Sequence, residues 1–171
     1  MSSRKLTIIG FVFALSSMST AKADIMEYMV TGPVQLGSTV DSQFGTIDLN
    51  TGVFVQIGPN ETTQVAGLGE TTATGSTVYA SSYAAGVGIL YTVNTATGAL
   101  TQVGGSSNVD YYFFGSTLNG LYAVDIMGNL YSIDPGTGVP TLKGSLGITL
   151  NGFGNLSTNS STLYFGIGST R

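Results

Sequence analysis

The chain has 171 residues, of which only 8% are charged and 25 are glycine, and it contains no cysteine, histidine or tryptophan. Without cysteine and histidine it has no disulfide framework, no Cys-His or Ser-His-Asp catalytic site, and no histidine-based zinc or transition-metal site. From residue 24 onward two basic residues stand against nine acidic ones, a formal charge of −7. Such a surface neutralises few phosphates, so we expect no nucleic-acid partner.

Residues 1–23 are predicted to be a secretory signal peptide. A basic start is followed by an apolar core at residues 6–15, and an Ala-Lys-Ala site ends the segment. A membrane anchor is the weaker alternative, because spanning a bilayer takes about 20 apolar residues. The sequence therefore predicts a secreted or periplasmic protein made of residues 24–171, with no stable membrane insertion after cleavage.

Short strands joined by tight turns are predicted for the rest of the chain, because Val, Thr and Tyr alternate with polar residues between Gly, Pro and Asn turn signals. No long apolar stripe with helical period follows the signal peptide. Outside the repeat described next, strands are expected at residues 25–30, 64–68, 77–81, 110–114, 121–125, 148–153 and 162–167, and a turn near 155–161.

One hairpin motif of 15 residues occurs three times, with cores at residues 44–58, 90–104 and 130–144. Each copy has an alternating strand, a turn that ends in Thr-Gly, and a return strand that ends in Gly. The aligned Thr-Gly pairs are Thr51-Gly52, Thr97-Gly98 and Thr137-Gly138. Their threonines are 46 and 40 residues apart, which is the length class of four-stranded propeller blades.

The frame Leu-Tyr-x-Ile-Asp-x-x-Thr-Gly-x-x-Thr-x-x-Gly, followed by Leu-Tyr, resembles the repeats of secreted bacterial β-propellers of YVTN or PQQ type, in uncharacterised exported families. Copies 90–104 and 130–144 carry it best, and Gly45 departs from it where Tyr is expected. The resemblance implies an all-β, β-propeller-like fold of about three four-stranded antiparallel blades, each made of a hairpin and the two strands after it. It specifies no chemistry, and the lack of Trp argues against a PQQ dehydrogenase.

Three blades are fewer than the four or more of closed propellers, so we expect an incomplete or open propeller. Three explanations stay open. The sequence is truncated relative to a longer relative, several copies associate into a ring, or the strands close into another all-β form such as a sandwich.

The candidate site residues are oxygen donors. Asp48 and Asp134 share one repeat position, where a carboxylate accepts backbone N–H bonds of the turn. Asn94, at the same position of the middle copy, serves in a turn but not as an acid or base, so turn capping is preferred to catalysis. The weaker hypothesis is calcium binding, for which the candidate ligands are Asp48, Asn50, Asp110, Asp125 and Asp134. No catalytic or cofactor-binding residue is predicted.

The leading hypothesis is a secreted, non-enzymatic binding or interaction module for an unknown protein or carbohydrate, with self-association as a further expectation. One alternative is a propeller-type hydrolase or lyase that uses carboxylates or calcium. A cluster of Asp110, Asp125 and Asp134 around one cavity would favour it. The other alternative is a truncated fragment without independent function.

Overall fold

A computed structural model describes residues 26–31, 42–63, 65–71, 77–84, 87–150, 154–159 and 161–167. The predicted signal peptide lies outside these ranges. Within them the chain forms strands and turns and contains no helix, hence none long and apolar enough to cross a membrane. All strand pairs are antiparallel, so the predicted all-β class is confirmed.

The strands form successive sheets along the chain. The first sheet has the order β1 (Met26–Thr31), β2 (Gln43–Asp48), β3 (Phe54–Gln56). The second sheet has the order β4 (Val65–Thr71), β5 (Thr77–Ala84), β6 (Val87–Val93), β7 (Leu100–Ser107). The third sheet has the order β8 (Phe113–Thr117), β9 (Gly120–Val124), β10 (Asn129–Ile133), β11 (Pro140–Ser145). A two-stranded sheet of β12 (Gly154–Asn159) and β13 (Thr162–Ile167) follows.

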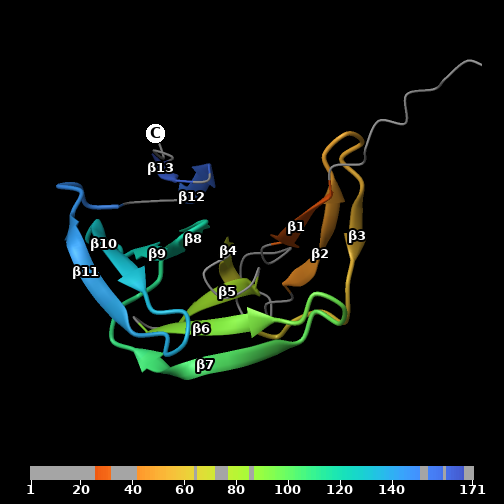
Figure 1. Ribbon diagram of the computed structural model, residues 1–171, viewed down its shortest axis with the longest axis horizontal. Helices are drawn as coiled ribbons and strands as arrows, with labels where there is room; N and C mark the ends of the chain where they lie inside the picture. Colours follow the sequence, from red (N-terminus) through yellow and green to blue (C-terminus); the bar gives the residue numbers. More distant parts are fainter. Residues whose placement is uncertain are drawn as a thin grey trace, which may run out of the picture.

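The sheets succeed one another around an open arc (Figure 1). Strand β4 packs against β1 on one side and against β8 on the other, and β8 in turn packs against β12. The first strand of each later sheet thus lies at the inside of the arc, and the repeat hairpins lie outside. This is how neighbouring propeller blades are placed, and the described residues form an open, propeller-like series of blades.

The core consists of three clusters, each between two neighbouring sheets. Successive side chains of a strand point to opposite faces, and β5 shows the consequence. Val78 and Ala80 pack with Phe44 of the first sheet, whereas Tyr79 packs with Phe114 of the third. Because the middle sheet is apolar on both faces, it joins its two neighbours into one body.

The three repeat cores form the hairpins β2–β3, β6–β7 and β10–β11, as predicted. Their turns share one geometry. Gly52, Gly98 and Gly138 have φ of +74°, +77° and +71°. Each donates its N–H to the carbonyl of the aligned Asp or Asn, at 2.7, 2.8 and 2.8 Å. A side chain is disfavoured in this left-handed region, which accounts for the glycine of the Thr-Gly pair.

The predicted grouping of strands into blades is wrong by half a repeat. The sequence analysis joined each hairpin to the two strands after it, but β4 and β5 pair with the later hairpin β6–β7. Only residues 85–86 separate β5 from β6, and such a short connection places consecutive strands side by side. Tyr79, Tyr122 and Tyr164 each lie in the second strand of a sheet.

The innermost strands also differ from prediction. A strand was expected at 148–153 and a turn near 155–161, whereas Gly154–Asn159 is strand β12. Likewise β8 begins at Phe113 and not at residue 110. These strands contain glycine and small polar residues that resemble turn sequences. Neighbouring inner strands lie so close that larger side chains do not fit: a Cβ on Gly115 would lie 2.9 Å from the carbonyl oxygen of Leu156.

Candidate functional site

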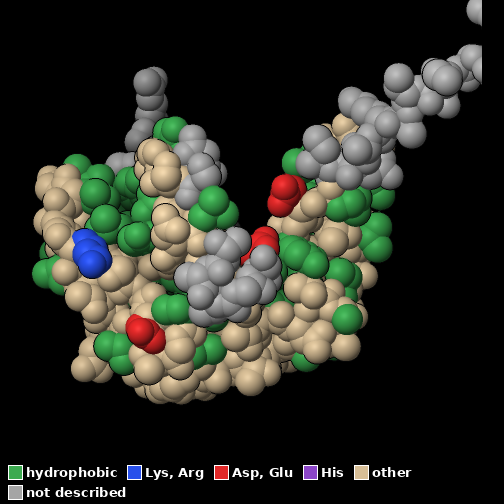
Figure 2. Space-filling view, in the orientation of Figure 1, with side chains coloured by type: hydrophobic (Ala, Val, Ile, Leu, Met, Phe, Trp, Pro, Cys, Tyr) green, Lys and Arg blue, Asp and Glu red, His purple; other side chains and the backbone are tan. Residues whose placement is uncertain are grey.

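A pocket lies on the concave side of the arc, where the inner strands of all four sheets meet. Its volume is about 160 Å³. Figure 2 shows the hollow with acidic side chains at its edge. The residues that line it are Glu27, Tyr28, Leu68, Gly69, Glu70, Val78, Gly115, Ser116 and Leu156.

Contacts between sheets fix the shape of the pocket. The backbone N–H of Glu70 on β4 donates to Oγ of Ser116 on β8 at 2.8 Å. The hydroxyl of Thr71, the residue after Glu70, donates to the Leu118 carbonyl at 3.0 Å. On the opposite wall, the Tyr28 ring stacks on Phe44 with centroids 5.5 Å apart. These contacts fix the strands that bear Glu27, on β1 of the first sheet, and Glu70, on β4 of the second.

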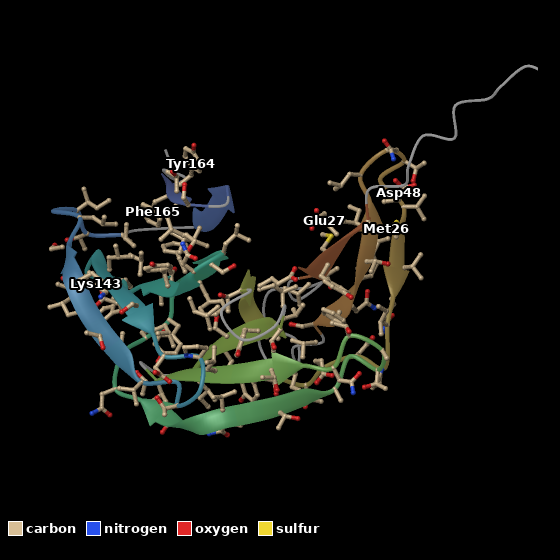
Figure 3. The ribbon with its side chains drawn as sticks, viewed as in Figure 1. Met26, Glu27, Asp48, Lys143, Tyr164 and Phe165 are labelled. Atoms are coloured by element: carbon tan, nitrogen blue, oxygen red, sulfur yellow. The ribbon has the colours of Figure 1, made fainter. Side chains whose placement is uncertain are left out.

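The pocket is acidic. Glu27 and Glu70 are exposed, and the only Lys or Arg among the described residues, Lys143, lies on β11. Figure 3 shows Lys143 at the other end of the arc from Glu27. Carboxylates accept strong hydrogen bonds from ammonium and guanidinium groups, and an aromatic ring beside them attracts the same cations. The arrangement can hold a positively charged group.

Asp48 and Asp134 accept hydrogen bonds from their own turns, which confirms the predicted turn capping. The Asp134 Oδ1 accepts from the N–H of Gly136 at 2.9 Å, and from the N–H and the hydroxyl of Thr137 at 2.8 and 2.9 Å. Asp48 accepts from the Thr51 hydroxyl at 2.7 Å and from the Asn50 N–H at 2.8 Å. The Thr51 and Thr137 hydroxyls are the main cause that lowers the pKa of each carboxyl.

Replacement of Asp134 tests this role. Asp134→Asn should be slightly less stable than the wild type at about pH 7, because an amide keeps the turn bonds, as Asn94 does at 3.0 and 3.2 Å, but lacks the carboxylate's charge. Asp134→Ala should melt at a lower temperature. Since the folded-state pKa of Asp134 lies below its ordinary 3.8, its charge stabilises the fold above that pH and ceases to do so as the pH falls through the folded-state pKa. Circular-dichroism melts should show the wild-type advantage over Asp134→Asn shrinking in acid, and an advantage that grows in acid would contradict the assignment.

Asp110 lies in the loop before β8, and Asp125 lies in the turn between β9 and β10. The two carboxyl groups are near enough to interact electrostatically. Burial, and secondly the charge of Asp125, raise the pKa of Asp110, whose Oδ1 is buried without a hydrogen-bond partner. Asp125 accepts from the Tyr131 hydroxyl at 3.0 Å and from both the N–H and the side-chain amide of Asn129 at 2.9 Å. Within the part of the chain that the structure describes, no three acidic side chains form a metal-binding group. Calcium binding stays a prediction.

Glu27 and Glu70 were not among the predicted site residues, which were oxygen donors in the repeat turns and near the ends of predicted strands. A usable signal was present. Charged residues are rare in this chain; Glu27 lies inside the predicted strand 25–30, and Glu70 follows the predicted strand 64–68 by two residues. A charge inside a strand of a nearly uncharged protein marks a face that contacts solvent or a ligand.

Comparison with known proteins found a likeness among solved structures. No family model matches the chain, and no curated protein matches it. Among solved structures, the crystal structure of BamB from Moraxella catarrhalis is similar at 13% identity with a TM-score of 0.39. The match covers 82% of this chain, which spans 44% of the length of that BamB chain.

Proposed function

We propose that the protein is an exported, non-enzymatic binding module, and that its concave pocket receives a basic side chain of a protein partner. The observation that carries the proposal is the pair Glu27 and Glu70, which line one pocket from two different sheets. No cation of the described residues lies there to neutralise them. A partner that supplies the cation gains charge-assisted hydrogen bonds, each worth about 0.2–1 kcal/mol at exposed carboxylates such as these.

The size of the pocket supports a side chain over a larger ligand. Pockets for drug-sized molecules usually measure about 300–1,000 Å³, and this one is smaller. Leu68, Val78 and Leu156 give it apolar walls, which suit the aliphatic stem of Lys or Arg. Export is inferred from the predicted signal peptide.

The hydrolase or lyase alternative gains no support from the residues that prompted it. It called for Asp110, Asp125 and Asp134 around one cavity. None of the three lines this pocket, and Asp134 is engaged in its own turn. A binding role needs only the acidic pocket.

Titration with short peptides tests the proposal. In an NMR titration at low salt, tetralysine should shift the amide signals of Gly69, Glu70 and Ser116, and tetraalanine should not. The double variant Glu27→Gln/Glu70→Gln should bind tetralysine at least tenfold more weakly, which is a loss of about 1.4 kcal/mol. Glu61→Gln is the matched control, because Glu61 lies outside the pocket, and it should bind as the wild type does.

Two results would contradict the proposal. One is equal affinity of the double variant and the wild type for tetralysine. The other is a response of the same amides to the neutral sugar cellotetraose and not to tetralysine, which would point to the carbohydrate class instead.

A further inference from the structure

Neighbouring sheets are joined at their outer edges by one contact that occurs twice. The Thr97-Gly98 turn of the second sheet lies against Ile57 and Gly58, just after β3. A Cβ on Gly58 would overlap the Thr97 carbonyl oxygen, and one on Gly98 would lie 2.6 Å from the Ile57 carbonyl oxygen. The glycine that ends a repeat is therefore the seat for the Thr-Gly turn of the next repeat.

The second instance has the same geometry. The Thr137-Gly138 turn of the third sheet lies against Gly104 at the outer strand of the second. A Cβ on Gly104 would overlap the Thr137 carbonyl oxygen, and one on Gly138 would lie 2.9 Å from the Val103 carbonyl oxygen. Leu90 lies beneath this turn, 3.6 Å from the same added Cβ. Twice within the chain, therefore, the Thr-Gly turn of the next repeat covers such a seat.

At the first sheet the turn has no seat among the described residues. A Cβ on Gly52 would meet nothing within 4 Å, and Gly52 is exposed whereas Gly98 and Gly138 are buried. Leu49, in the same turn, is 55% exposed, although the residues at its position in the other two repeats are half-buried. This end of the arc offers an unoccupied turn.

At the third sheet the seat meets no Thr-Gly turn among the residues that the structure describes. A Cβ on Gly144 would meet nothing within 4 Å. Leu130 is only half-buried, whereas the residues at its position in the other repeats, Phe44 and Leu90, are 2% and 1% exposed. Lys143 precedes Gly144, where the other copies have Ile57 and Val103. This end of the arc offers an unoccupied seat.

We propose that a second copy of the chain joins these two ends, with its Thr51-Gly52 turn on Gly144 of the first copy. A Thr-Gly turn meets the glycine at the aligned position twice inside the chain, and Gly144 differs from those two glycines in lacking a positive φ. Charge favours the pairing as well. Asp48 caps the donated turn as a carboxylate, and Lys143 stands beside the seat, so opposite charges meet.

The contact is head-to-tail, which generates a ring if the rotation closes and a chain if it does not. Strand β1 is the edge strand of its sheet, but Tyr28 pairs with Thr46 as Tyr79 of β5 pairs with Thr92, so β1 corresponds to the second strands of the later sheets. Strand β13 is the second strand of the last sheet. A blade formed by β12 of one copy and β2–β3 of the other has a single second position. It can hold β13 or β1, but not both. The proposal does not depend on the acidic pocket, which lies on the inner strands.

Light scattering over a concentration series tests the proposal with two variants. Gly144→Val fills the seat at an exposed glycine without positive φ, with no atom near enough to clash, so the fold is retained. Leu49→Lys places a charge on the exposed turn, opposite Lys143 of the other copy. The wild type should gain mass with concentration, and each variant alone should stay monomeric.

A mixture of the two variants gives the decisive result. Gly144→Val keeps a good turn and Leu49→Lys keeps a good seat, so the mixture should form one-to-one dimers and nothing larger. A wild type that stays monomeric at millimolar concentration, association that both variants leave intact, or a mixture that stays monomeric would overturn the proposal. Glu27→Gln/Glu70→Gln should associate as the wild type does, which separates this result from the pocket.

Discussion

Gly104→Val should destabilise the fold by roughly 3 kcal/mol, whereas Gly105→Val should change its stability little. At Gly104 the new side chain overlaps the Thr137 carbonyl oxygen of the next sheet, and overpacking of this kind costs about 1–3 kcal/mol. The φ of +63° adds strain of about 1–2 kcal/mol for a residue with a Cβ. Gly105 is exposed, has no positive φ and has no atom within 4 Å of an added Cβ.

Urea unfolding followed by circular dichroism measures both variants. The midpoint should fall for Gly104→Val and stay near that of the wild type for Gly105→Val. Equal midpoints for the two variants would mean that the turn of the third sheet does not rest on Gly104, and the description of how the sheets are joined would be wrong.

Leu90→Ala should cost about 3 kcal/mol of unfolding free energy, and Leu130→Ala at the aligned position about half of that. Leu90 is 1% exposed, packs with Tyr79 and Phe114, and lies beneath the Gly138 turn. Leu130 is half-buried, and no Thr-Gly turn of the described part of the chain covers it. Truncation therefore removes less buried surface at Leu130 and leaves no closed cavity.

The two variants are compared at low protein concentration, where association is negligible, by their chemical unfolding midpoints. The difference should narrow at high concentration if a second copy covers Leu130. A larger loss for Leu130→Ala than for Leu90→Ala would show that the third sheet is not the uncovered end of the arc.

The repeat and the all-β class could be predicted, because the Thr-Gly turns recur in register and their geometry is local. The reason for the glycine that ends each repeat could not be predicted. Gly58 and Gly104 are required by the turn of the next sheet, tens of residues away. Sequence spacing shows that a glycine recurs, but a contact between sheets shows why.

Gly45 has a similar explanation. It stands where the repeat expects Tyr, and the ring of Phe54 on β3 fills the place beside it: a Cβ on Gly45 would lie 2.7 Å from Phe54 Cε2. An aromatic side chain on a neighbouring strand commonly covers such a glycine. The first copy therefore departs from the motif in sequence but keeps an aromatic ring beside this position.

The inner strands and the pocket could not be predicted from local sequence patterns. Close packing at the inside of the arc selects Gly and Ser, whose local preference is for turns, so β12 was predicted as a turn. The pocket residues come from strands far apart in the sequence, as Glu27 and Ser116 show. Only the order of the sheets brings them together.

The most direct test of the account is a nuclear Overhauser measurement on the isotope-labelled protein at low concentration. If each Thr-Gly turn rests on the glycine of the preceding repeat, the α protons of Gly58 and Gly98 should give a strong cross-peak, and so should those of Gly104 and Thr137, because these backbones touch. Absence of both cross-peaks in the folded protein would contradict the proposed joining of the sheets.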